Sequence, residues 1–222
     1  MPNLILIPTA GERAVMEPLL QPTTSDDRWR IELCGFGIAA AAARTAMLVE
    51  RHRPERVILT GTAGTFDEEL AVGEAFNFSR VGCYGIGAGS GDEFITAGEM
   101  GWRHWRVDGS FSIKETDCTD SGIGDLLELS NVSASADRLL LTACAASANA
   151  EDLRRRREKF PRAAAEDMEG FGVAVACRMA EIPLQIIRGI SNQAGDRDKT
   201  HWKTNAALQS AATVVIENTH CG

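Results

Sequence analysis

Glu12 stands where a carboxylate could do acid–base chemistry. It follows the apolar run 4–7 and lies beside Gly11, directly after the first predicted strand. A carboxylate in that place can face a ligand crevice and act as a general base on water. The same residue type is also common in the first turn of a helix, where it complements the helix dipole. The sequence leaves both interpretations open.

Three further acids stand just before the apolar segment 170–180; they are Glu166, Asp167 and Glu169. Acids in this position could simply complement the dipole of the helix that follows. A carboxylate can also accept hydrogen bonds from the two vicinal hydroxyls of a ribose. Met168, between these acids, would then offer a soft apolar surface to the sugar.

Asn192 lies at the carboxyl end of the buried run 183–190, directly after Ser191. An amide side chain carries a donor and an acceptor side by side. A 6-oxopurine that leaves through its five-membered ring presents O6 as an acceptor and a protonated N7 as a donor, so one asparagine satisfies both. An aspartate would suit a 6-aminopurine better, because a carboxylate accepts from the exocyclic amine. An isolated asparagine is also a frequent turn residue.

These residues lie between predicted strands and helices that alternate along the chain. Apolar runs typical of strands occur at residues 4–7, 29–34, 57–60, 138–146 and 183–190. Helical segments are predicted at residues 38–52, 150–159, 170–180 and 205–217. We interpret the charge run 154–157 as the solvated face of its helix. Strands alternating with helices predict a three-layer α/β fold.

Ligands of such sheets bind outside the carboxyl ends of the strands. This rule directs attention to residues 8–13, 61–65, 145–147 and 191–195. The second of these segments, with Gly61 and Gly64, reads as a glycine-punctuated turn. Between residues 72 and 132 the signal weakens, and frequent glycines predict loops and short strands.

The segment that begins Gly35-Phe36-Gly37 fits the pattern G-x-G-x-x-A, because Ala40 follows. After a strand and before a helix, this pattern is typical of dinucleotide binding. The confirming acid, about 20 residues further on at the end of the next strand, is missing. A tight turn with close helix–strand packing is therefore the favoured interpretation, with a nicotinamide-dependent oxidoreductase as the alternative.

Composition limits the class of protein. The 222 residues carry 31 acids and 23 bases, a net charge of −8 that disfavours nucleic acid as a partner. The length predicts one domain over residues 1–222. The apolar stretches are too short to span a membrane, and the first residues lack the pattern of a signal peptide, so we expect a cytoplasmic protein. The six cysteines, at 34, 83, 118, 144, 177 and 221, lack metal-site spacing and are expected to be reduced.

Four stretches together resemble the purine nucleoside phosphorylase and nucleosidase superfamily: PTAGE, GFGIAAAAARTAMLVERHRPERVILTGTAGT, KFPRAAAEDMEGFGVAVACRMAEIPL and IIRGISN. Within it, EDMEGFGVAVACRMA and RGISNQAGDRDKTHW look most like the branch of futalosine hydrolases. The resemblance implies a phosphorylase/hydrolase-like αβα fold with a central mixed, mostly parallel sheet. It also implies that futalosine is hydrolysed to hypoxanthine, as in one route to menaquinone. Another purine nucleoside, or binding without catalysis, is the alternative.

The resemblance also implies a role for each matching residue. Glu12 would activate water below C1′ of the ribose, and Glu169 would hold the 2′- and 3′-hydroxyls. Asn192 would contact O6 and N7 of the departing base, while the proton for N7 comes from solvent or another group. Met168, Ala63 and Gly64 would contact the sugar and the base. Ser191 and Arg188 would support the last strand. No metal or organic cofactor is implied, and the family usually forms homo-oligomers.

Two departures from the family bear on the chemistry. Phosphorylases with a similar turn often place an arginine just before it to bind phosphate, whereas Leu59 stands here, which favours water as the nucleophile. Nucleosidases usually stack an aromatic ring on the base from the stretch 145–147, which has none in this chain. We consider Phe171, Phe94 and Phe160 as substitutes.

The 5′ tail of futalosine ends in an aryl carboxylate, which calls for a cation or backbone donors. Arg197, Lys199 and Lys203 follow Asn192 and are candidates for this contact. The alternative is that they belong to a solvated surface loop.

Overall fold

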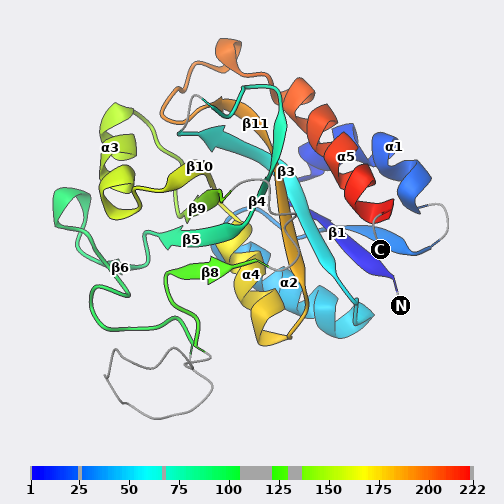
Figure 1. Ribbon diagram of the computed structural model, residues 1–222, viewed down its shortest axis with the longest axis horizontal. Helices are drawn as coiled ribbons and strands as arrows, with labels where there is room; N and C mark the ends of the chain where they lie inside the picture. The colour runs from blue at the N-terminus through cyan, green and yellow to red at the C-terminus, as the bar shows by residue number, and fades with distance from the viewer. Residues whose placement is uncertain (1, 25–26, 67–68, 106–121, 130–136, 221–222) are drawn as a thin grey trace.

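The structure is a computed structural model that describes residues 2–24, 27–66, 69–105, 122–129 and 137–220 (Figure 1). The strands are β1 (Asn3–Ile7), β2 (Trp29–Leu33), β3 (Val57–Thr65), β4 (Ala75–Phe78), β5 (Arg80–Tyr84), β6 (Gly87–Ala88), β7 (Ile95–Thr96), β8 (Leu126–Glu128), β9 (Leu139–Ala143), β10 (Ala163–Asp167) and β11 (Leu184–Gln193). The helices are α1 (Ala10–Thr24), α2 (Ile38–His52), α3 (Ala150–Lys159), α4 (Gly170–Met179) and α5 (Thr204–His220), with short 3-10 turns η1 (Gly91–Glu93) and η2 (Lys199–His201).

The main sheet has nine strands and is built around β3. Its order is β2-β1-β3-β10-β9-β5-β8, and β11 pairs with both β3 and β4. Within this sheet, five of the pairings between described strands are parallel and three are antiparallel. The sheet is therefore mixed and mostly parallel, as the resemblance implied.

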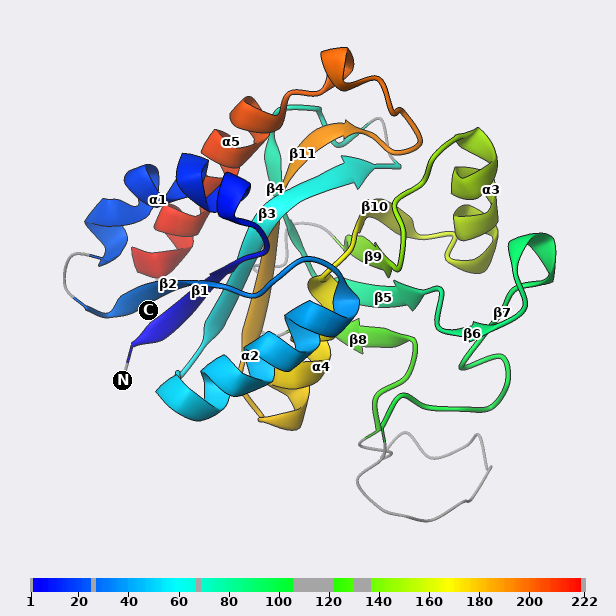
Figure 2. The same cartoon turned by 180° about the vertical axis from the view of Figure 1, so that it is seen from behind.

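Helices cover both faces of this sheet, which gives the predicted three layers. Figures 1 and 2 show α1 and α5 together on one face and α2 and α4 on the other, and each pair of helices is in contact. The alternation of side chains along β1 serves both faces. Leu4 and Leu6 pack in the cluster that includes α2 and α4, whereas Ile5 and Ile7 pack against α1 and α5. Burial on both faces explains the continuous apolar run in the sequence.

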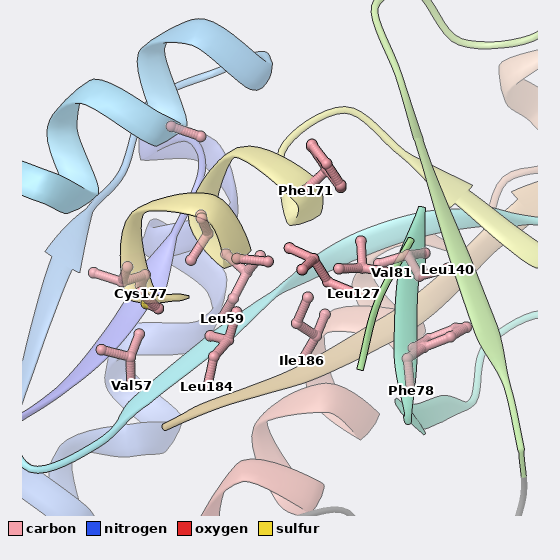
Figure 3. Packing of buried hydrophobic residues seen from close by; sticks show 14 of the residues in the cluster. Val57, Leu59, Phe78, Val81, Leu127, Leu140, Phe171, Cys177, Leu184 and Ile186 are labelled. Atoms are coloured by element: carbon pink, nitrogen blue, oxygen red, sulfur yellow. The ribbon is translucent and has the colours of Figure 1, made fainter. Parts of the chain in front are cut away.

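The cluster under α4 joins residues from distant parts of the chain (Figure 3). Leu59 of β3, Ile186 of β11 and Phe171 of α4 are all buried there. The burial of Leu59 overturns one expectation. Its side chain points into the core and is not among the residues that line the cavity described below, so its apolar character says nothing about phosphate.

Two local predictions were wrong, and two elements were not predicted. The segment 61–64 is not a turn, because β3 continues to Thr65 and pairs with β11 and with β10. Strand β10 and helix α1 were not foreseen. The arginine run on α3 is not wholly solvated, because Arg156 is buried whereas Arg154 is exposed.

Among the described cysteines, Cys34, Cys83 and Cys177 are buried and Cys144 is exposed, and all four are free thiols. Burial raises the pKa of each of the three buried thiols to about 12. Cys118 and Cys221 lie outside the described residues. In the described chain, none of the helices combines the length and the apolar character needed to cross a membrane.

Candidate active site

A cavity of about 360 Å³ lies at the carboxyl ends of β1, β3 and β11. All four segments selected from the sequence contribute to its wall. The lining residues are Pro8, Thr9, Glu12, Phe36, Thr62, Ala63, Gly64, Ala146, Ser147, Glu166, Asp167, Met168, Glu169, Ser191, Asn192, Arg197 and Trp202. Seven of the eight residues with a predicted role lie in this wall, although they come from widely separated parts of the chain, and the eighth, Arg188, lies beneath it.

Glu12 lies both in the first turn of a helix and at the cavity wall. It lies in the first turn of α1, where its backbone N–H donates to Thr9 Oγ1 at 3.2 Å and its Oε2 accepts from Thr9 N at 3.2 Å. This reciprocal pair is a capping box. The other carboxylate oxygen, Oε1, accepts from the backbone and hydroxyl of Thr62 at 2.9 and 3.1 Å. The cap of α1 thus fixes a carboxylate at the cavity wall.

Glu169 is held between two helices and a buried arginine. Its Oε1 accepts from Gly37 N at 3.0 Å, at the start of α2, and its Oε2 lies 3.3 Å from Nη2 of Arg188. Gly37 has a positive φ of 82°, which favours glycine at this position. Burial raises the pKa of Glu169 to about 7, opposed by the charge of Arg188 and assisted by that of Asp167.

Arg188 is fully buried beneath the cavity and anchors the acids above it. Its Nε donates to Asp167 Oδ2 at 3.1 Å, and Asp167 also accepts from Thr142 Oγ1 at 2.6 Å and Gly170 N at 2.8 Å. Nearby carboxylates raise the pKa of Arg188 against the effect of burial. Its Nη1 has no hydrogen-bond partner among the described residues. Arg188 thus holds Asp167 in place, while its Nη1 group remains without a partner in the described chain.

Asn192 owes its position to an irregularity in β11. The pairing of β11 with β3 shifts between Ile190 and Asn192, which leaves Ser191 as the extra residue of a bulge. Ser191 Oγ donates to Asn192 Oδ1 at 2.7 Å, and Asn192 Nδ2 donates to Gln193 O at 2.8 Å. These contacts fix the orientation of the amide. One lone pair of the oxygen and one N–H of the nitrogen are left for a ligand.

Ala63 and Gly64 lie on β3 beside this bulge, and Gly64 pairs with Asn192. Met168 follows β10 and lines the same cavity. Gly64 has no side chain, so the backbone of β3 forms part of the cavity wall.

Sequence reasoning missed a buried polar cluster formed by Ser147, Arg156 and Glu166. Glu166 accepts from Ser147 N at 2.8 Å and from Ser147 Oγ at 2.7 Å, and it forms an ion pair with Arg156. The spacing of Leu153, Arg156 and Phe160 could have revealed this, because residues three and four apart share a helix face. Arg156 therefore lies on the apolar side of α3.

The aromatic candidates for base stacking were wrong. Phe171 and Phe160 belong to two hydrophobic clusters, and the ring of Phe94 packs on Tyr84 with centroids 4.8 Å apart. None of these three lines the cavity, whereas Phe36 and Trp202 do. Neither residue lies in the stretch 145–147 that the family pattern points to, so no sequence signal selected them.

Of the three cations after Asn192, only Arg197 lines the cavity. Its guanidinium lies over the ring of Trp202, 5.4 Å from the centroid. Lys199 and Lys203 are not in the cavity wall. Within the described ranges, no group of three or more His, Cys, Asp and Glu side chains is arranged to hold a metal ion.

The fold is shared with solved nucleosidase structures. The 5′-methylthioadenosine/S-adenosylhomocysteine nucleosidase of Colwellia psychrerythraea, solved with adenine, superposes with a TM-score of 0.72 at 21% identity, over 99% of this chain and 94% of that one. The corresponding enzyme of Neisseria meningitidis, with methylthio-immucillin-A, gives 0.71 at 17% identity, over 99% and 100% of the two chains. These structures have the same three-layer αβα fold.

Sequence comparisons find relatives along most of the chain. A model described as the phosphorylase superfamily matches residues 133–218. A futalosine hydrolase of Streptomyces coelicolor is 29% identical over 197 residues, which cover 85% of this chain and 77% of the relative. A 5′-methylthioadenosine/S-adenosylhomocysteine nucleosidase of Colwellia psychrerythraea is 28% identical over 189 residues, with 82% and 74% covered. The chain is therefore similar to the phosphorylase superfamily over residues 133–218 and to two kinds of nucleosidase over most of its length.

Proposed function

We propose that this protein hydrolyses the N-glycosidic bond of a purine nucleoside, and that its substrate is futalosine. The observation that carries the proposal is that Glu12, Glu169 and Asn192 line one cavity. Cleavage of this bond builds positive charge on the ribose and negative charge on the base, so both ends need stabilising groups. Two carboxylates and one amide supply them from separate strands and helices.

Glu12 is the base that activates water. A Cβ on Gly61 would stand 2.9 Å from Glu12 Oε1 and 2.6 Å from Arg188 Nη1, so only glycine lets both groups pack against β3 here. Glu12 also lines the cavity, so its carboxylate can hold a water there, whereas Arg188 stays buried below. Deprotonation by Glu12 gives the nucleophile, and the negative charge of Glu12 favours the oxocarbenium ion.

Glu169 and Met168 hold the sugar. Gly37 and Arg188 fix the Glu169 carboxylate but leave lone pairs for the 2′- and 3′-hydroxyls. Met168 lines the cavity beside it and provides an apolar surface under the ribose. This pair presents C1′ in line with the water.

Asn192 receives the base. Its remaining N–H donates to O6 and its remaining lone pair accepts from a protonated N7, so it stabilises hypoxanthine as the bond breaks. Ser191 keeps the amide in this orientation through its 2.7 Å hydrogen bond. An amide does not deliver the proton to N7 itself, so the proton comes from another source.

The charge of the cavity favours water over phosphate. Its described lining includes four acids, Glu12, Glu166, Asp167 and Glu169, and a single arginine, Arg197. Arg188 lies below with Asp167 and Glu169 as its partners. A phosphate dianion would be repelled by these acids, whereas water would not.

Arg197 is the group that favours futalosine among purine nucleosides. Among the described residues of the cavity wall it is the one basic side chain, and it could pair with the aryl carboxylate of the 5′ tail. Trp202, stacked on Arg197, offers a flat surface to the aryl ring. Phe36 also lines the cavity and is 65% exposed, and a second copy of the chain in a homo-oligomer would cover it.

The test is to incubate the protein separately with futalosine, aminofutalosine, inosine and methylthioadenosine and to follow free base by chromatography. We expect hypoxanthine release from futalosine at the highest kcat/KM. Preferred release of adenine from methylthioadenosine would instead assign the function of the other relatives, which are similarly close. A protein that cleaves none of the four would not have the proposed activity.

A further inference from the structure

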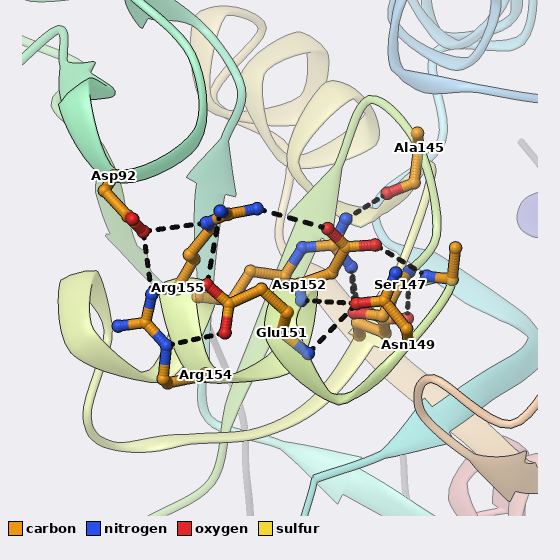
Figure 4. Close-up of polar contacts among 11 residues, drawn as sticks. Asp92, Ala145, Ser147, Asn149, Glu151, Asp152, Arg154 and Arg155 are labelled. Atoms are coloured by element: carbon orange, nitrogen blue, oxygen red, sulfur yellow. Dashed lines mark hydrogen bonds and ion pairs between the residues drawn. The ribbon is translucent and has the colours of Figure 1, made fainter.

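The polar cluster beside the cavity has a composition that structural support alone does not require. Glu166 and Arg156 are each 5% exposed and Ser147 is 1% exposed. Figure 4 shows Ala145 and Ser147 on the loop that leads into α3, where Arg156 also donates to the carbonyl oxygen of Ala145. A buried ion pair is weak evidence for stability, because well-packed apolar residues serve as well or better. Glu166 and Ser147 also line the cavity, where a charged group meets the ligand.

Strand pairing sets Glu166 opposite Asn192 across the cavity floor. Gly64 of β3 pairs with Asn192 of β11 and with Glu166 of β10. Neighbouring strands are about 4.8 Å apart, so the backbones of Asn192 and Glu166 are roughly 10 Å apart with a residue lacking a side chain between them. A flat ring lying over Gly64 would have the amide at one edge and the carboxylate at the other.

The hydrogen bonds of Glu166 change the polarity of that second edge. The N–H of Ser147 would otherwise present a donor, but it is taken by Oε1 of Glu166 at 2.8 Å. Oε2 accepts from Ser147 Oγ and from Arg156, whereas Oε1 has one recorded donor. A carboxylate has about four lone-pair sites, so Oε1 keeps one for the ligand. At this edge the ligand therefore meets the acceptor Glu166 Oε1 and not the donor Ser147 N–H.

We propose that Glu166, held by Ser147 and Arg156, accepts the N1–H of the base and thereby selects 6-oxopurines over 6-aminopurines. A 6-oxopurine carries a proton on N1, next to the O6 that Asn192 contacts. A 6-aminopurine carries a lone pair on N1, which the carboxylate repels. The inference rests on the proposed nucleosidase function and adds a specificity-determining residue to it.

The experiment compares kcat/KM for futalosine and aminofutalosine, which differ at position 6 of the base, in the wild type and in Glu166→Gln. The glutamine has a similar shape but brings an N–H₂ group that can donate to an unprotonated N1. We expect the wild type to prefer futalosine and the variant to lose at least tenfold of this preference, because a hydrogen bond to a charged group is removed. The matched control is Glu158→Gln on α3, an exposed acid paired with Arg154, which should leave the ratio unchanged.

Binding of the free bases separates this inference from the proposed function. Hypoxanthine should bind the wild type more tightly than adenine does, and Glu166→Gln should reduce the difference, whether or not any nucleoside is cleaved. A folded variant that keeps the wild-type ratios, or a wild type that prefers the amino base, would overturn the role of Glu166. If the variant does not fold, 1-methylhypoxanthine replaces it as the probe. Binding to the wild type as tight as that of hypoxanthine would contradict an N1–H contact.

Discussion

Glu12 caps helix α1, and in the proposed mechanism the same side chain activates water. Because Thr9 and Glu12 form a capping box, the carboxylate cannot swing away from the cavity without exposing the first turn of α1. The residue is therefore preorganised by the same contacts that start the helix. This coupling lets the catalytic role be tested without loss of the fold.

The first prediction concerns Glu12→Gln. Glutamine also serves at the third position of a capping box, but its NH₂ group replaces one oxygen that accepts from Thr9 or Thr62, so the melting temperature should fall modestly while the fold is kept. It cannot take a proton from water, so kcat should fall by about 10²–10⁴, the usual contribution of a general base, while substrate binding persists. Single-turnover kinetics and binding titrations measure the two effects. Glu17→Gln, which disturbs only an exposed pair with Arg13, is the matched control. Near-normal turnover in Glu12→Gln would remove the residue from the mechanism.

The second prediction concerns Asn192→Asp. The carboxylate accepts from an exocyclic amine but repels O6, so the ratio of futalosine to aminofutalosine cleavage should fall by at least tenfold. Because Ser191 Oγ can donate to either side chain, the local geometry should be kept. Competition between the two substrates in one reaction gives the ratio directly. An unchanged ratio would mean that the base is selected elsewhere in the cavity.

The third prediction follows from the raised pKa of Glu169, which lies near 7. Below this pH the free enzyme carries a proton on Glu169, which leaves fewer acceptor sites for the ribose hydroxyls. The profile of kcat/KM should therefore fall on the acid side with an apparent pKa of about 7, since this parameter reports groups of the free enzyme. In Glu169→Gln this acid limb should be absent and activity low throughout. An acid limb that persists in the variant would belong to another group.

At the scale of elements, the hydrophobic pattern correctly predicted the helices and strands whose local preference agrees with their tertiary contacts. Helix α2 matches its predicted bounds, because a run of alanines ends before Pro54. Strands β1, β9 and β11 were also found, because burial on both faces leaves an unbroken apolar run.

The elements that were not predicted are those in which pairing with neighbouring strands overrides the local helix or turn preference of the sequence. Ala163–Asp167 has the composition of a helix, yet it forms β10 because β3 and β9 hydrogen-bond to it on both sides. Gly61 and Gly64 read as turn residues, but β11 pairs along the whole of β3. Helix α1 contains Pro18, which disfavours a helix interior, so its pattern was not recognised. The cluster around Glu166 was missed for the same reason, since it depends on β10.

The fourth prediction tests how the packing of α2 on α4 positions Glu169. Gly172 of α4 faces α2 so closely that an added Cβ would clash with the carbonyl oxygen of Ile38. Gly172→Ala should therefore destabilise the protein by about 1–3 kcal/mol and move Gly37 away from Glu169, which raises KM. Thermal unfolding and steady-state kinetics measure both effects. Gly11→Ala on α1, where an added Cβ would meet nothing within 4 Å, should stabilise slightly. Equal behaviour of the two variants would contradict the packing argument.

At the scale of the whole molecule, the mixed sheet gathers acids that lie far apart in the sequence. Glu12 comes from the first helix, while Glu166, Asp167 and Glu169 come from the junction of β10 and α4. The net charge of −8 is thus concentrated in part at the cavity. Like charges at this spacing tolerate a cationic transition state better than an anionic nucleophile. From this distribution of charge we expect water, and not phosphate, to be the second substrate.

The last prediction is that inorganic phosphate is not a co-substrate. Rates of base release should be the same with and without phosphate, and the sugar product should be free and should carry oxygen from water labelled with heavy oxygen. The reason is electrostatic, because phosphate would have to enter beside four carboxylates whose buried counter-ions, Arg156 and Arg188, already have partners. Mass spectrometry of the sugar decides between the two nucleophiles. Formation of a sugar 1-phosphate that depends on added phosphate would show that the acids leave room for an anion, and Glu12 would then lose its role as the base for water.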